Sequence, residues 1–110
     1  MPEPHKPPDL AEIEIGTVFS ALASPLRRRI VADLLTRPGM RADRCSEFDV
    51  GVGKSTLTHH IRVMSQAGLI TETDHGNRCA IRLRAAELED RFPGLLDLIR
   101  ADAAMAAPAR

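Results

Sequence analysis

The segment that most restricts the fold of this chain spans residues 54–67 and reads KSTLTHHIRVMSQA. Leu57, Ile61 and Met64 recur at helical spacing and mark one side of a helix, the side that must be buried. The opposite side carries polar side chains, namely Ser55, Thr58, His59 and Arg62. Gly68 supplies a stop after the last helical residue. The sequence therefore predicts a helix with one buried side and one polar side.

Three helices are predicted before this segment. Within residues 10–23 the apolar residues return at helical spacing: Ile15, Val18, Phe19 and Leu22. In SPLRRRIVADLLTRPG, Ser24 is placed to cap a helix that starts at Pro25, and Pro38–Gly39 ends it. Residues 41–48, RADRCSEF, indicate a short helix, and residues 51–53 the turn after it.

The pattern changes after residue 68. Two short extended runs flank the polar cluster at residues 74–77, which predicts a hairpin. Residues 84–92 return to helical composition, and Pro93–Gly94 interrupts them. Residues 95–105 predict a last helix with an apolar side: Leu95, Leu98, Ile99 and Met105.

A chain of 110 residues is long enough for one compact domain. We expect this domain to span residues 10–105, between disordered tails at residues 1–9 and 106–110. Aromatic residues are limited to three phenylalanines, so the core must be aliphatic. No run approaches the roughly 20 apolar residues of a membrane span, and the first residues lack the apolar run of a signal peptide. We therefore expect a cytoplasmic protein with no membrane partner.

Formal charges sum to zero, so net charge gives no argument for a nucleic-acid partner. Their distribution is uneven, because residues 51–84 hold five basic residues against two acidic ones. Alone, this modest asymmetry favours an ordinary solvated surface over a DNA-binding one.

The order of predicted elements is that of a winged helix-turn-helix. FSALASPLRRRIVADLL followed by KSTLTHHIRVMSQAGLI, with RFPGLLDLI further on, resembles the ArsR/SmtB family of bacterial repressors over residues 15–99. The resemblance implies a mainly α (α+β) fold: a winged helix-turn-helix with a two-stranded wing and terminal dimerisation helices. It also implies that residues 54–67 enter the DNA major groove beside the wing.

Seven residues are expected to contact DNA: Lys54, Ser55, Thr56, Thr58, His59, Arg62 and Arg78. At the helix N-terminus, Lys54, Ser55 and Thr56 offer a cation and backbone amides to phosphates. Thr58 and His59 can reach base edges, whereas Arg62 and the wing's Arg78 are expected to hold phosphates. The two-fold dimer of the family implies an interface formed by the terminal helices, with Ile15, Phe19, Leu95, Leu98 and Ile99.

Two more specific interpretations, a nucleotide-binding loop and a metal site, have less support in the sequence. Residues 51–56 look like the end of a phosphate-binding loop, but Phe48 stands where that loop requires a glycine, so we expect no enzyme. Adjacent helical side chains point about 100° apart, which makes His59 and His60 poor joint metal ligands. His60 is expected to be partly buried, and residues 27–29 to lie on the solvated side of their helix.

Thiolate metal sensors of the family carry a pair of cysteines where this chain has Cys45 alone. Other members bind ions through Asp and His of the last helix, which here offers Asp97 and Asp102 but no histidine. We therefore expect no metal and no cofactor. An atypical metal site with His5 or His75, and a redox switch between Cys45 and Cys79, stay open as alternatives.

We expect a sequence-specific DNA-binding transcriptional regulator, a repressor that binds a pseudo-palindromic operator as a homodimer. An effector that the sequence does not identify completes the expected partners. The alternatives are a winged-helix module for protein association without DNA binding, or a metal- or redox-responsive sensor.

Overall fold

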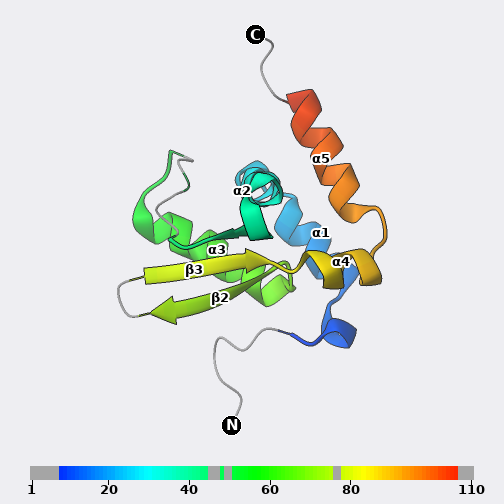
Figure 1. Ribbon diagram of the computed structural model, residues 1–110, viewed down its shortest axis with the longest axis horizontal. Helices are drawn as coiled ribbons and strands as arrows, with labels where there is room; N and C mark the ends of the chain where they lie inside the picture. The colour runs from blue at the N-terminus through cyan, green and yellow to red at the C-terminus, as the bar shows by residue number, and fades with distance from the viewer. Residues whose placement is uncertain (1–7, 45–47, 49–50, 76–77, 107–110) are drawn as a thin grey trace.

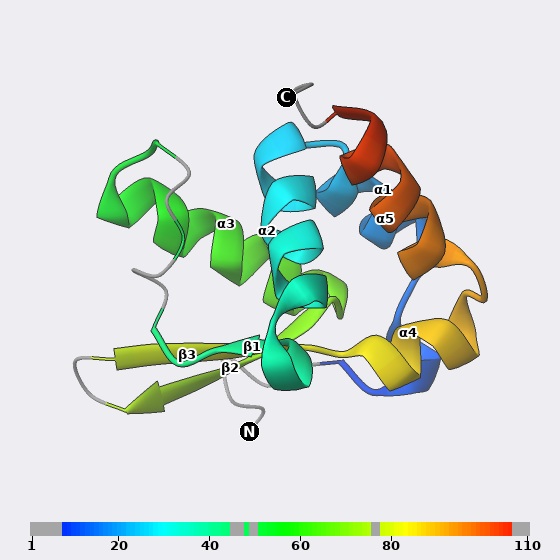
Figure 2. The same ribbon diagram turned by 45° about the horizontal axis from the view of Figure 1, so that its top comes forward.

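The computed structural model describes residues 8–44, 48, 51–75 and 78–106 (Figure 1). Its elements, in chain order, are η1 (Leu10–Glu12), α1 (Ile15–Leu22), α2 (Pro25–Thr36), η2 (Pro38–Met40), β1 (Arg41–Ala42), α3 (Lys54–Ala67), β2 (Ile70–His75), β3 (Arg78–Leu83), α4 (Ala85–Arg91) and α5 (Leu95–Ala106). Helices α2 and α3 lie over one face of the sheet, and α4 and α5 follow the end of β3 (Figure 2). The predicted α+β fold is confirmed.

Local signals set the limits of α2 and α3, as the sequence predicts. The Ser24 hydroxyl accepts a hydrogen bond from the Arg27 amide at 3.4 Å, and Pro25 is the first residue of α2. Helix α3 ends at Gly68, whose φ of 90° lies in the left-handed region. The Gly68 amide donates to two carbonyls in the last turn of α3, those of Met64 and Ser65.

The sheet is antiparallel, with strand order β1-β3-β2. Strands β2 and β3 form the predicted hairpin, with Ile70 opposite Leu83. Side chains alternate between the two faces, so Ile81 and Leu83 enter the core while Arg82 between them is exposed. The short β1 adds a third strand to the wing, which the sequence predicted to have two.

The prediction of a short helix over residues 41–48 is wrong for the residues of this segment that the structure describes. Arg41 and Ala42 form β1 and pair with Arg82 and Ile81 of β3. None of the other described residues of this segment is helical. The positive φ values of Gly39 and Met40, 68° and 52°, turn the chain out of α2 into the sheet. Pairing with β3 buries Ala42, which local helical composition does not anticipate.

The helix predicted over residues 10–23 is divided. The turn η1 is closed by the Glu12 carboxylate, which accepts from the Asp9 amide at 2.8 Å, and α1 begins only at Ile15. Between them Ile13 is extended and buried. Its side chain lies against Gly68, where a Cβ atom would stand 2.7 Å from Ile13 Cγ1. The break in the helix therefore places Ile13 in the core at the end of α3.

The core is aliphatic, as the scarcity of aromatic residues predicts. Helices and strands contribute fully buried side chains, among them Val18, Ile30, Leu34, Ile61, Met64, Ile81 and Leu88. Helix α5 packs against α2, beside α1 (Figure 2). Phe48 is buried, and the Arg37 guanidinium lies 5.0 Å from its ring centroid.

We predict that Gly68→Ala lowers the free energy of unfolding by about 3 kcal/mol, combining left-handed backbone strain with overpacking. The added Cβ would lie within 3 Å of two carbons of Ile13. Gly94→Ala is the matched control, because Gly94 has a φ of 91° and open space around a built Cβ. The control should lose only about 1 kcal/mol. Urea denaturation measures both, and equal losses would contradict the close packing of Ile13 on Gly68.

Candidate DNA-binding surface

Helix α3 presents a polar side to solvent. Leu57, Ile61 and Met64 are buried, whereas Ser55, Thr58 and His59 are exposed. In both views the N-terminal end of α3 and the free end of the hairpin lie on the same side of the molecule (Figures 1 and 2). The polar side of the helix and the wing can therefore face one partner together.

The first turn of α3 is suited to a phosphate. Its N-cap residue, Gly53, has no side chain that could cap the helix and compete with an outside acceptor for the first amides. Lys54, Ser55 and Thr56 are all exposed there. A cation, two hydroxyls and the positive end of the helix dipole thus lie together at this end.

Thr58 is already bonded within the helix. Its hydroxyl donates to the Lys54 carbonyl at 2.9 Å. The hydroxyl oxygen can therefore still accept a hydrogen bond, but its proton is committed. Such a side chain suits the amino group of adenine or cytosine, or a thymine methyl contact.

The two histidines differ in environment. His59 is exposed, and its ring centroid lies 5.7 Å from that of His60 in an edge-on arrangement. His60 is half-buried, and its Nδ1 accepts a hydrogen bond from Arg27 Nε at 3.0 Å. Burial, then the charge of Arg27 and then His59, lower the pKa of His60 below its ordinary 6.5. His60 is therefore a neutral packing residue rather than an outward contact.

The predicted set of DNA contacts also includes two arginines, Arg62 in the C-terminal half of α3 and Arg78 at the start of β3. Arg62 Nε lies 3.3 Å from Glu72 Oε2 on β2, so its charge is partly compensated inside the fold. The backbone of Arg78 pairs with His75 where the hairpin turns, and its side chain lies outside the described part. A phosphate contact by either residue stays a prediction.

Helices α1 and α5 each expose large apolar side chains, which together are called the apolar surface of α1 and α5. Its residues are exposed by 48% at Ile15, 56% at Phe19, 65% at Leu98 and 87% at Met105. Each pair shares one side of its helix, at spacings of four and seven residues. The sequence also placed Leu95 and Ile99 in the interface. Both are largely buried in the protomer's own core, and their part in an interface stays a prediction.

Sequence analysis missed the role of the arginines at the start of α2. Arg27 Nη1 donates to the Ala21 carbonyl at 3.2 Å, and Arg28 Nη1 to the Leu22 carbonyl at 2.6 Å. These carbonyls end α1 and have no partner inside the helix. Arg28 also pairs with Asp102 of α5 at 3.5 Å. A basic residue just beyond a helix C-terminus is the signal that could have indicated this cap.

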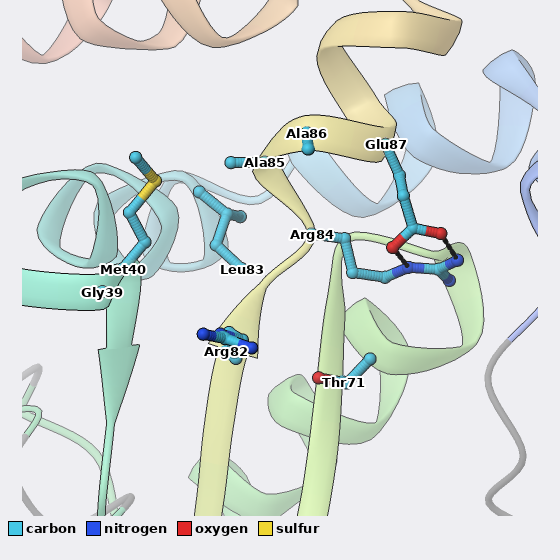
Figure 3. Close-up of a pocket in the computed structure, with 9 residues that line it drawn as sticks. All are labelled: Gly39, Met40, Thr71, Arg82, Leu83, Arg84, Ala85, Ala86 and Glu87. Carbon is cyan, nitrogen blue, oxygen red and sulfur yellow. Dashed lines mark hydrogen bonds and ion pairs between the residues drawn. The ribbon is translucent and has the colours of Figure 1, made fainter.

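A small pocket lies where β3 enters α4, lined by Gly39, Met40, Thr71, Arg82, Leu83, Arg84, Ala85, Ala86 and Glu87 (Figure 3). The Arg84 guanidinium is buried, binds Glu87 through two hydrogen bonds and donates to the Pro8 carbonyl at 2.7 Å. The hydrogen bonding from Arg84 lowers the pKa of Glu87, helped by the Arg84 charge and opposed by burial. Arg84 thus joins α4 to the N-terminal segment.

The metal site and the redox switch that the sequence left open involve residues that lie mostly outside the described part of the chain. In the part of the chain that the structure describes, no three His, Cys, Asp or Glu side chains cluster to hold a metal ion, and no helix could cross a membrane. Cys45 and His5 lie outside that part, as do the side chains of Cys79 and His75.

In chain order, helices α1 and α2 are followed by α3, whose apolar side is buried, and then by the antiparallel hairpin of β2 and β3. This order defines a winged helix-turn-helix, a class of DNA-binding domain. Residues 22–73 match a helix-turn-helix domain family. The chain is also 29% identical over 85 residues to the transcriptional repressor SdpR of Bacillus subtilis. The aligned residues make up 77% of this chain and 92% of that protein. The chain is thus a winged helix-turn-helix transcriptional regulator, as its resemblance to the ArsR/SmtB repressors implied.

We predict that Glu87→Gln makes the protein less stable at pH 7 by about 1 kcal/mol and reduces the loss of stability in acid. Because the folded pKa of Glu87 is lowered, its contribution is present at neutral pH and is lost as the pH falls below about 4.5. Urea denaturation at pH 7 and pH 4 measures both effects. Asp90→Asn, an exposed carboxylate on the same helix, is the control and should change neither. An unchanged stability for Glu87→Gln at pH 7 would contradict the assignment.

Proposed function

We propose that this chain is a repressor that binds a pseudo-palindromic operator as a homodimer. The exposed polar side of α3, beside the free end of the hairpin, carries the proposal. The name of the similar B. subtilis protein, a transcriptional repressor, supports the same direction of control. Occupying a promoter in this way blocks transcription by excluding other proteins from the same DNA.

Insertion of α3 into the major groove presents Thr58 and His59 to base edges. Lys54 and the first amides of α3 then bind a phosphate on one side of the groove. Arg78, at the turn of the wing, holds the backbone on the other side. Base contacts select the sequence, and phosphate contacts fix the register of the helix.

Two copies associate through the exposed apolar surface of α1 and α5. A pair of such surfaces related by a two-fold axis buries Phe19 and Leu98 of each copy at once. The two α3 helices then face half-sites about one helical turn apart or a multiple of it. Operator symmetry follows from the symmetry of the dimer.

We predict that His59→Ala weakens operator binding by about 1 to 3 kcal/mol, with much less loss on random DNA, because it removes a base contact. Arg78→Ala should weaken both and flatten the salt dependence by about one unit, because it removes a phosphate contact. The operator is found by selecting duplexes from a random library, and salt titrations on both DNAs compare the variants. Equal losses on the two DNAs would remove His59 from the base-reading set. A wild-type protein that selects no duplex would leave protein association alone as the function.

We predict that Leu98→Asp yields a monomer, because it places unpaired charges in the interface at a cost of several kcal/mol. Leu98 is already exposed in the protomer, so the fold itself should be kept. Ala104→Asp, exposed on another side of α5, is the control and should remain dimeric. Sedimentation measures the mass of each variant. A fully dimeric Leu98→Asp protein would exclude this surface as the main interface.

A further inference from the structure

One guanidinium group, that of Arg27, joins the end of α1 to α3. Its Nη1 donates to the Ala21 carbonyl at 3.2 Å, and its Nε donates to His60 Nδ1 at 3.0 Å. Because the guanidinium is planar and rigid, the two contacts fix each other's geometry. The His60 ring is therefore held from α2, an element 33 residues away in sequence.

The direction of this hydrogen bond defines the state of His60. Arginine can only donate, so Nδ1 must be the unprotonated nitrogen, and the ring proton resides on Nε2. A protonated ring has no acceptor to offer Arg27. The bond therefore exists only while His60 is neutral.

His60 stands next to the proposed base-reading residues. It follows His59 directly in α3, and the two rings are in edge-on contact range at 5.7 Å. The exposed His59 ring thus has a fixed neighbour on one side. The contact gives His60 a means of acting on DNA recognition without touching DNA.

We propose that His60 is a positioning residue for operator recognition, which holds α3 and the His59 ring in place by accepting the hydrogen bond from Arg27. The inference rests on the proposed function, because it concerns how α3 reads a base sequence. It assigns His60 an effect on the preference for operator over random DNA, rather than on DNA affinity in general.

This arrangement makes the preference sensitive to mild acid. Among the described residues, the charged and titratable groups that act on His60 are Arg27 of α2 and His59 of α3, while α1, which also packs on α3, carries none. On the sheet side, Glu72 is paired with Arg62. Burial and Arg27 lower the pKa of His60, so the paired state is complete above its ordinary 6.5 and is lost as the pH falls below that value.

The test compares His60→Ala with His60→Asn. The amide oxygen of asparagine can stand where Nδ1 accepts from Arg27, and it does not titrate. At pH 7.5, His60→Ala should lose about tenfold in operator affinity and less than about threefold on random DNA. His60→Asn should restore most of the preference. Alanine favours helix more than histidine does, so loss of α3 is not the expected cause.

Two further arms test the link to Arg27 and to the proton. Arg27→Lys keeps the charge but offers no planar pair of donors, so its loss and that of His60→Ala should not multiply in the double variant. Between pH 7.5 and 5.5 the preference of the wild type should fall by up to about tenfold more than that of His60→Asn. His59 is unchanged in all these proteins, so the difference between them reports on His60.

A wild type that binds operator, with an unchanged preference in His60→Ala or no rescue in His60→Asn, would overturn the inference alone. A wild type that selects no duplex would overturn the proposed function and this inference with it. Nitrogen chemical shifts of the His60 ring in the free wild type decide the pairing independently. They should show the Nε2-protonated tautomer at pH 7.5, and the Nδ1-protonated tautomer would overturn the inference.

Discussion

The apolar side of α3 packs into an aliphatic core, and the position of every polar group on its exposed side follows from that packing. Leu57, Ile61 and Met64 are buried at successive turns, which fixes the rotation of the helix about its axis. Thr58 and His59 face outward as a result, before any DNA contact is made. The close approach of Ile13 to Gly68 fixes the end of the same helix. The close packing of α3 in the core thus fixes the direction of the polar side chains on its exposed side.

Charge contributes less to this surface than the sequence alone suggests. Among the basic residues of the 51–84 segment, Arg62 pairs with Glu72, and Arg84 pairs with Glu87 within the fold. Lys54 and Arg82 have no ion pair with a described residue. Among the described basic side chains of this segment, Lys54 and Arg82 are therefore the ones left for phosphates. A dimer doubles these contacts and makes the second set intramolecular, which compensates for a protein of zero formal charge.

Local signals made much of the fold predictable. The Ser24 cap with Pro25, and Gly68 after α3, are recognisable in sequence because each acts within one helical turn. The strand at Arg41–Ala42 was not predictable in this way, since its partner lies about 40 residues further along the chain. Likewise, the apolar side of α5 is visible in sequence, but its division between core and surface depends on where α2 lies. For this reason Leu95 and Ile99 were assigned to the interface although they are buried within the protomer.

The exposed polar residues of α3 could be predicted from local sequence signals, whereas the residues that hold α3 in place depend on contacts between distant segments. Thr58 and His59 could be chosen from helical periodicity, because the sidedness of α3 is a local property. The hydrogen bond from Arg27 to His60 joins α2 to α3 across the fold, so periodicity placed Arg27 on a solvated side instead. Yet Arg27 also binds the last turn of α1, the helix that exposes Phe19. In the proposed dimer, a shift of α1 at the interface therefore reaches α3 through the Arg27 side chain as well as through the direct packing of α1 on α3. By linkage, DNA binding at α3 must act back on the dimer contact with the same coupling free energy.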